Sequence, residues 1–145
     1  ILKINLRDGF HGYAHVSTDP CIIFYDGRFK TEISVNEIIK LKVLFILSVS
    51  NYAIKDGIWP VIGRSGLNDE QLKKPYMFKQ DPISGQLSIY HSDFAETNYE
   101  RAATVEECED LERMAIWDHN HVEDRLNDHY ENKPNVWVSQ LALKR

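Results

Sequence analysis

The sequence predicts an α+β fold: a curved antiparallel sheet, partly barrel-like in its N-terminal half, packed with two or three short helices that lie mainly in the C-terminal half. Two observations support this prediction. Before residue 26, three short segments of strand-like composition follow one another, with turn-forming residues between them. After residue 103, apolar residues recur at helical spacing behind residues that cap helices.

The first quarter of the chain predicts a series of strands. Residues 2–6 alternate between apolar and polar side chains and then meet the turn-forming Arg7-Asp8-Gly9. Residues 12–16 resume the alternation, so we expect a hairpin, and residues 21–25 predict a third strand. Three short strands in succession favour a strongly curved antiparallel sheet.

A short helix and a buried strand are expected next. Ser34 and Glu37 have the spacing of a capping box, which predicts a helix through Lys40. Residues 43–49 are almost continuously apolar, so they predict a strand that is buried on both faces.

The chain is organised around residues 51–82, which combine rigid and flexible backbone with large aromatic side chains. Proline fixes its own φ and restricts the residue before it, so Trp59-Pro60 predicts an extended dipeptide, passing across the sheet. Gly63 and Gly66 allow turns that other residues resist. We expect this region to be a structural scaffold with Trp59 in a core.

The second part of this region predicts a helical turn, a loop and a strand. Residues 67–75 fit one helical turn that Pro75 ends. Phe78 is expected to join Trp59 in the core, and Asp81 opens a turn over residues 81–85. The alternation that follows the turn predicts a half-buried strand ending at Tyr90.

The C-terminal third predicts a loop and two helices. Residues 93–103 are polar and predict a loop, after which a capping box from Thr104 to Glu107 predicts a helix to about Met114. A further helix is expected from about Asn120, ended by Lys133-Pro134. The residues expected to face the core are Val105, Cys108, Leu111 and Ala115 in the first of these helices, and Val122, Leu126 and Tyr130 in the second.

Residues 1–133 are predicted to form a single domain, and residues 134–145 a C-terminal extension. The extension fits an edge strand or a short helix equally well. In the second helix, Glu123, Asp124 and Asn127 are expected to be largely outside, whereas Arg125 is expected to brace the helix against the Trp59 region.

Composition limits the classes of protein that this chain can belong to. A hydrophobic fraction of 43% in 145 residues suits one folded domain. No apolar run approaches the ~20 residues that span a membrane, and no signal peptide is expected, so cytoplasm is the predicted location. Cys21 and Cys108 fit neither a zinc signature nor a disulfide framework and are expected to be buried thiols.

Charge is distributed unevenly along the chain. Residues 93–131, Asp93 and Glu96 included, hold thirteen acidic residues against three arginines, a net charge of −10, whereas the rest of the chain carries +5. This separation predicts an acidic face. Such a face would repel nucleic acid and complement a basic protein partner.

The sequence predicts neither a metal site nor a catalytic centre. On a helix, His121 and His129 lie about 12 Å apart, which is too far for one metal ion to bind both. No phosphate-binding loop or nucleophile motif is present, and the acids from Glu106 to Asp110 fit the first turn and solvated face of a helix.

Six stretches, taken in order, resemble the immunity protein 26 family of bacterial polymorphic toxin systems. The resemblance covers residues 2–130 and leaves the tail after Lys133 outside. The stretches are Asp8-Gly9-Phe10 with Gly12-Tyr13, Trp59-Pro60 to Gly63, Phe78 to Asp81-Pro82, Thr104 to Glu112, Ala115 with Trp117, and His121 to Leu126. Within them we expect a structural core motif of Trp59, Pro60, Gly63, Phe78, Asp81, Trp117 and Arg125.

The resemblance implies an α+β protein that is not an enzyme, needs no cofactor, and neutralises a toxin made beside it in the cytoplasm by binding it. The implied partner is a cognate protein toxin. The acidic charge favours a basic toxin domain, such as a nuclease, over nucleic acid, and the absence of a long apolar run argues against a membrane partner. The hypothesis that follows is an acidic partner-binding face formed by Glu106, Glu109, Asp110, Glu123, Asp124 and Asp128.

Two alternatives remain open at this point. The first is a small hydrolase or transferase that uses a cleft between Trp59 and Asp81 together with Asp124 and Arg125. The second is a non-catalytic adaptor that associates weakly with itself through the apolar residues of the tail.

Overall fold

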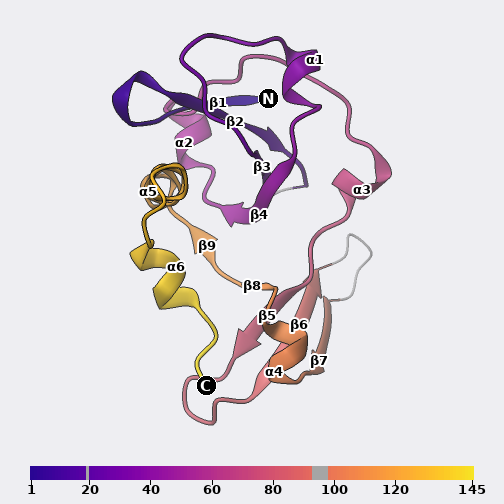
Figure 1. Cartoon of the computed structure of the whole chain (residues 1–145). Coiled ribbons are helices and arrows are strands. Elements are labelled where there is room, and N and C mark those ends of the chain that lie inside the picture. Colours follow the sequence, from indigo (N-terminus) through magenta and orange to yellow (C-terminus); the bar gives the residue numbers. More distant parts are fainter. Residues whose placement is uncertain (19, 93–97) are drawn as a thin grey trace.

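The chain folds into two β-sheets with short helices around them, as the computed structural model shows for residues 1–18, 20–92 and 98–145 (Figure 1). The first sheet has the strand order β1-β2-β3-β4-β9, and the second has the order β7-β6-β5-β8. The first sheet is curled, so the predicted α+β class with a curved sheet is confirmed.

The predicted N-terminal strands are present. Strands β1 (Leu2–Asn5), β2 (His11–Val16), β3 (Cys21–Tyr25) and β4 (Val43–Val49) form an antiparallel meander. The β1–β2 connection is a tight 3₁₀ turn, η1 (Arg7–Gly9). Two successive residues there have positive φ, 60° at Asp8 and 77° at Gly9, as a short aspartate-glycine turn allows.

Strand β4 is buried only along its second half, which differs from the prediction. Val43 is 49% exposed, whereas Leu47 is 1% exposed. The reason lies in the neighbouring strand β9 (Ile116–Trp117), which pairs only with Ser48 and Val49. The first half of β4 therefore lies at the sheet edge with no paired strand beside it, which a run of apolar residues does not reveal.

The Trp59 region runs alongside β1 and does not pass across the sheet as predicted. The backbone N–H of Lys3 donates to Pro60 O at 3.1 Å, and that of Ile62 donates to Ile1 O at 2.9 Å. Gly63 is needed for space: a Cβ there would lie 2.6 Å from the side chain of Val35. The segment therefore covers the β1 edge of the first sheet.

Three short helices precede the second sheet. Helix α1 (Val35–Ile38) begins after Ser34, whose hydroxyl accepts from the Glu37 N–H as the predicted cap requires. Helix α2 (Tyr52–Lys55) was not predicted. Helix α3 (Asp69–Leu72) is the predicted helical turn.

The second sheet contains more strand than the sequence predicted. Strands β5 (Met77–Gln80) and β6 (Leu87–Ser92) pair around the predicted turn, but β5 itself was not expected. Strand β7 (Asn98–Ala102) lies in the segment predicted as a loop and pairs with β6, whereas residues 93–97, including Asp93 and Glu96, lie outside the described residues.

The helix predicted from Thr104 to Met114 is much shorter. Helix α4 (Val105–Cys108) has the predicted capping box, but the chain then forms β8 (Glu112–Arg113) and β9. Strand β8 pairs with β5 in the second sheet, and β9 pairs with β4 in the first. Residues 112–117, the bridging segment, thus give one edge strand to each sheet, and this pairing replaces the expected helix.

Trp59 and Phe78 lie in different cores. Trp59 belongs to the main core of the first sheet, together with Phe24, Trp117 and Leu126. A second core lies on the other face of that sheet, around Tyr13, Tyr25 and Ile38. Phe78 packs with Leu87, Ile89 and Cys108 in the third core, between the second sheet and α4. Cys108 and Cys21 are both buried, as expected.

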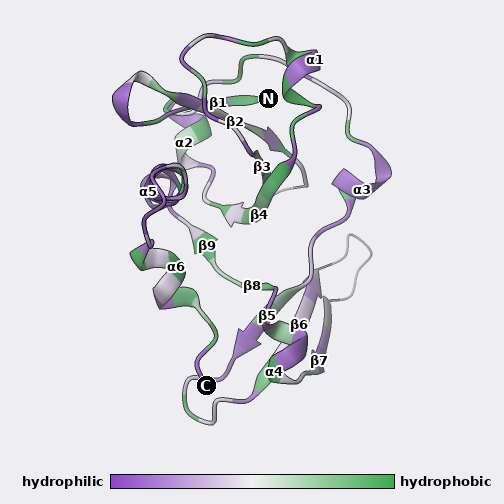
Figure 2. Ribbon diagram, viewed as in Figure 1, coloured by the Kyte–Doolittle hydropathy of each residue, from purple (hydrophilic) through white to green (hydrophobic). Residues whose placement is uncertain are grey.

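Helices α5 (His119–Tyr130) and α6 (Val136–Leu141) complete the fold. Helix α5 matches the prediction and buries Val122 and Leu126, although Asn127, expected outside, is also buried. Figure 2 shows α5 as a mainly hydrophilic helix and α6 as a mixed one. Helix α6 shows that the tail, residues 134–145, contains a helix and not an edge strand.

The tail connects the two sheets. Trp137 and Leu141 pack against the main core, and Leu143 packs against the core of the second sheet. Arg113 Nε donates to Leu141 O at 2.9 Å, and Gln80 Nε2 donates to Lys144 O at 2.6 Å. Figure 1 shows the tail descending from α5 to the second sheet.

Candidate partner-binding surfaces

The six acidic residues expected to form one face fall into two groups at different places in the fold. Glu106 lies in α4, and Glu109 and Asp110 directly follow it, beside the second sheet. Glu123, Asp124 and Asp128 lie in α5, beside the first sheet. Figure 1 shows α4 at the lower right, beside β6 and β7, and α5 on the left, above α6.

Two of the α5 carboxylates accept hydrogen bonds from buried or half-buried tryptophans. Trp59 Nε1 donates to Glu123 Oε2 at 3.0 Å, and Trp137 Nε1 donates to Asp124 Oδ2 at 3.1 Å. An indole N–H that leaves water needs such an acceptor. These carboxylates therefore hold the fold together, a role that the acidic composition of α5 alone does not indicate.

Arg7 of the η1 turn compensates part of the negative charge of the α5 carboxylates. Arg7 lies 3.0 Å from Glu131 and 4.0 Å from each of Asp124 and Asp128. Asp128 also accepts from Asn135 Nδ2 at 2.8 Å, which fixes the start of the tail. The side chain of Asp128 is only 18% exposed, so little of its charge faces a partner.

The acids near α4 are more exposed. Glu107 caps the helix and pairs with Arg101, whose hydrogen bond holds the pKa of that carboxyl below its usual value. Glu109 pairs with Arg145 in the tail. Glu106 and Asp110 are exposed, and neither forms an ion pair within the described part of the chain. These two carboxylates are free to meet a cationic partner.

Arg125 is half-buried, and its contacts differ from the expectation. Its Nη2 donates to Glu112 Oε1 at 2.6 Å, and its guanidinium lies 4.0 Å from the ring centre of Phe45 and 5.2 Å from that of Trp117. Arg125 thus braces α5 against the bridging segment and β4. Trp59 is braced by Glu123 instead.

The residues of the alternative enzymatic cleft are not brought together. Trp59 is fully buried, so it cannot line an open cleft. Asp81 lies in the turn of the second sheet, where its Oδ1 accepts from the backbone N–H groups of Ser84 and Ile83, and these bonds lower its pKa. Asp124 is held by Trp137.

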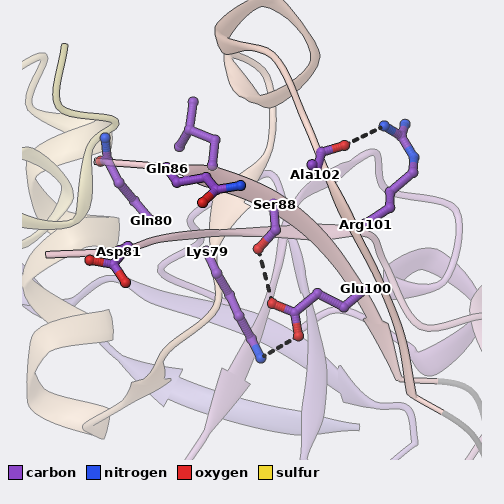
Figure 3. Close-up of a pocket in the computed structure, with 9 residues that line it drawn as sticks. Lys79, Gln80, Asp81, Gln86, Ser88, Glu100, Arg101 and Ala102 are labelled. Atoms are coloured by element: carbon purple, nitrogen blue, oxygen red, sulfur yellow. Dashed lines mark hydrogen bonds and ion pairs between the residues drawn. The ribbon is translucent and has the colours of Figure 1, made fainter. Parts of the chain in front are cut away.

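The second sheet has a polar hollow of about 490 Å³, lined from β5, β6 and β7 and from the turn between β5 and β6. Figure 3 shows Glu100 between its two partners: Ser88 Oγ donates to Oε1 at 3.0 Å, and Lys79 Nζ lies 3.4 Å from Oε2. Ser88 and Lys79 are thus both engaged by one carboxylate. The arrangement lines the hollow with hydrogen-bonding groups.

Neither a metal cluster nor a membrane span is found in the part of the chain that the structure describes. No three His, Cys, Asp or Glu side chains there lie close enough together to hold a metal ion. None of the helices there combines the length and the apolar character needed to cross a bilayer.

Comparison with known proteins agrees with the resemblance found in the sequence. The family model of immunity protein 26 matches residues 1–89, which run from β1 into β6 and include Trp59 and the part of the main core that β1 to β4 supply. No curated protein and no solved structure matches the chain. The match spans more than half of the 145 residues and assigns the role of an immunity protein, which neutralises a toxin. The chain therefore belongs to the immunity protein 26 family.

Proposed function

We propose that this protein neutralises a cognate toxin domain in the bacterial cytoplasm by binding it, without catalysis and without a cofactor. The observation that carries the proposal beyond the family role is the exposed acidic group near α4. Glu106 and Asp110 form no ion pair among the described residues, and Glu109 is paired only with an exposed arginine of the tail. We propose this group as the acidic surface that attracts the toxin.

The partner that suits this surface is a basic domain, such as a nuclease. Clustered carboxylates raise the rate at which the protein associates with a cationic partner. Dissolved salt weakens this attraction, and at about 0.1 M it largely screens charges that are more than about 10 Å apart. The α5 acids Glu123, Asp124 and Asp128 add to the negative field, but their contacts with Trp59, Trp137 and Asn135 limit how far they can turn toward a partner.

Co-expression with the toxin domain encoded by the neighbouring gene tests the proposal. We expect the protein to restore growth and to remain bound to the toxin during purification. A protein that is folded and in excess, yet neither binds nor rescues, would contradict the proposal.

Charge reversal then tests the acidic surface. Glu106→Lys with Asp110→Lys should weaken binding at low salt, by about tenfold for the pair. A matched control reverses two exposed acids elsewhere, Glu37→Lys with Asp56→Lys, and should leave binding close to that of the unmodified protein. An equal loss of toxin-binding affinity in both double variants would show that binding depends only on the total charge of the protein and not on the acids near α4.

A further inference from the structure

The connection between β5 and β6, the β5–β6 turn of residues 81–86, presents an isoleucine to solvent. Ile83 is 97% exposed, whereas the next most exposed large apolar side chain among the described residues, Ile116, is 62% exposed. A single exposed apolar side chain is ordinary on a protein surface. Two further features set Ile83 apart: the backbone that carries it is fixed, and apolar and acidic surface lies beside it.

Hydrogen bonds fix the backbone of the β5–β6 turn. Asp81 Oδ1 accepts from the backbone N–H of Ile83 at 2.8 Å and from that of Ser84 at 2.9 Å. The backbone N–H of Gly85 donates to Asp81 O at 2.9 Å, and Gly85 has the positive φ, 75°, that closes the turn. The ring of Pro82 restricts the backbone directly before Ile83. The backbone that carries Ile83 is therefore ordered before any partner arrives.

The tail supports the base of the turn. Gln80 Nε2 donates to Lys144 O at 2.6 Å and to Gly85 O at 3.3 Å, and Gln80 Oε1 accepts from the backbone N–H of Lys144 at 3.0 Å. Figure 1 shows the turn at the bottom of the view, beside the C-terminus. A turn that is held at its tip and at its base loses little conformational entropy when a partner binds it.

The turn borders the acidic group near α4 to which the proposed function assigns the attraction of the toxin. A hollow of about 730 Å³ lies beside Ile83, and its lining includes Leu87 of β6, Val105 of α4 and Leu141 of the tail. Val105 directly precedes Glu106, so the hollow and the acidic group adjoin. Protein interfaces combine a buried apolar centre with a polar, charged rim. An apolar tip and hollow beside exposed carboxylates fit this arrangement.

We infer that Ile83, held out by the preformed β5–β6 turn, anchors the complex by inserting into an apolar pocket of the toxin. That pocket lies beside the basic surface of the toxin that meets Glu106 and Asp110, the α4 acids. This inference rests on the proposed function and names the contact that keeps the complex together. The α4 acids act at a distance, on association, whereas burial of Ile83 acts after contact, on dissociation.

Dissociation of the full-length protein from the toxin domain encoded by the neighbouring gene tests the inference. Ile83→Ala should raise the dissociation rate about thirtyfold, as for an interface hot spot, with little change in the association rate. The matched control is Val61→Ala, because Val61 is 59% exposed and lies beside β1 in the first sheet. This control should dissociate at the rate of the unmodified protein. Both side chains are exposed, so both variants should fold.

A second pair of variants tests the rigidity of the turn and leaves Ile83 in place. Asp81→Ala removes the acceptor of the two N–H groups, whereas Asp81→Asn removes the same charge but keeps an oxygen that can accept from them. Asp81→Ala should weaken binding about fivefold, because the turn must then become ordered on binding, and Asp81→Asn should bind within about twofold of the unmodified protein. Amide exchange at Ile83 and Ser84 in the free protein should be faster in Asp81→Ala alone.

Two results would overturn the inference while leaving toxin binding itself established. The first is dissociation of Ile83→Ala at the unmodified rate. The second is equal binding by Asp81→Ala and Asp81→Asn although amide exchange shows that the turn has loosened only in Asp81→Ala. Failure of the unmodified protein to bind would instead reject the proposed function, and the inference with it.

Sedimentation of the protein alone distinguishes the other possible partner of Ile83, a second copy of this chain. The inference predicts that Ile83→Ala leaves the sedimentation of the protein unchanged. A dimer that becomes a monomer on this substitution would show that Ile83 binds another copy of the chain and would overturn the inference.

Discussion

Arg125 and Glu112 connect α5 to the bridging segment through a hydrogen-bonded ion pair of 2.6 Å. The side chain of Arg125 is 15% exposed and that of Glu112 is 32% exposed, so the pair is largely removed from water. Arg125 Nη1 is buried with no hydrogen-bond partner among the described residues, so Glu112 is the main compensation for its charge. The contact therefore connects α5, which packs on the first sheet, to strand β8 of the second sheet.

Removal of one member of this pair should cost more than removal of both. Glu112→Ala leaves a buried guanidinium uncompensated and should lower the free energy of unfolding by about 2 kcal/mol. Glu112→Met combined with Arg125→Met should cost less than the sum of the two single changes, because no unpaired charge remains. Urea unfolding measures both. Strictly additive losses would show that the pair is not coupled.

The tail should stabilise the fold through Trp137. Its ring stacks on His121 with 3.6 Å between ring centres, and its N–H reaches Asp124. Trp137→Ala should lower the free energy of unfolding by about 2 kcal/mol, less than a fully buried tryptophan, whereas Val136→Ala at an exposed neighbour should change it little.

Truncation after Pro134 tests whether the tail packs within its own chain or mediates self-association. We expect a monomeric but less stable protein, because the apolar side chains of the tail pack within the same chain. A full-length dimer that becomes a stable monomer on truncation would favour the adaptor alternative.

Two buried histidines should make the fold sensitive to mild acid. Burial lowers the pKa of both His11 and His15. His15 Nε2 donates to Ser65 O at 3.1 Å, so in the neutral ring Nδ1 accepts from the Tyr25 hydroxyl at 3.0 Å, and a second proton on the ring would reverse that bond. Burial therefore favours the neutral form of both rings in the folded protein.

The sign of the pH effect follows from these lowered pKa values. The unfolded chain takes up protons near pH 6.5 while the folded protein does not, so stability present above that pH is lost as the pH falls toward the folded-state values. The loss should reach about 1.4 kcal/mol per pH unit for each histidine. Denaturant unfolding from pH 7.5 to 5 measures it. His11→Gln with His15→Gln should flatten the curve, whereas His129→Gln at an exposed site should not.

The contribution of the α4 acids to the association rate should depend on salt concentration. Glu106→Lys with Asp110→Lys should slow association with the toxin at low ionic strength, and the difference from the unmodified protein should shrink as salt is added. Dissociation should change little. Stopped-flow mixing at several salt concentrations measures both rates, and an association rate independent of salt would contradict electrostatic attraction.

Sequence patterns among neighbouring residues correctly predicted turns, helix caps and the buried side of a helix. The Arg7-Asp8-Gly9 turn, the cap at Thr104 and the helical period of Val122 and Leu126 are properties of neighbouring residues. The bridging segment depends instead on strands far away in sequence. Its apolar spacing suits a helix, but pairing of β8 with β5 and of β9 with β4 determines its conformation.

The candidate site shows the same limit. Acidic composition indicated Glu123 and Asp124 but could not show that indoles 64 and 13 residues away would bind them. The two exposed acids Glu106 and Asp110 differ from these only in what lies around them. An apolar pocket between the two sheets was not predicted at all, because Pro75, Tyr90 and Ile116, which line it, come from three separate segments.

Titration of toxin activity with the purified protein is the most direct test of neutralisation by binding. A fixed amount of toxin domain is mixed with increasing amounts of the full-length chain, and the remaining toxin activity is measured. Stoichiometric binding predicts that activity falls in proportion to the protein added and disappears at about one equivalent. Undiminished activity at a large excess would contradict neutralisation, and complete loss far below one equivalent would indicate catalysis instead.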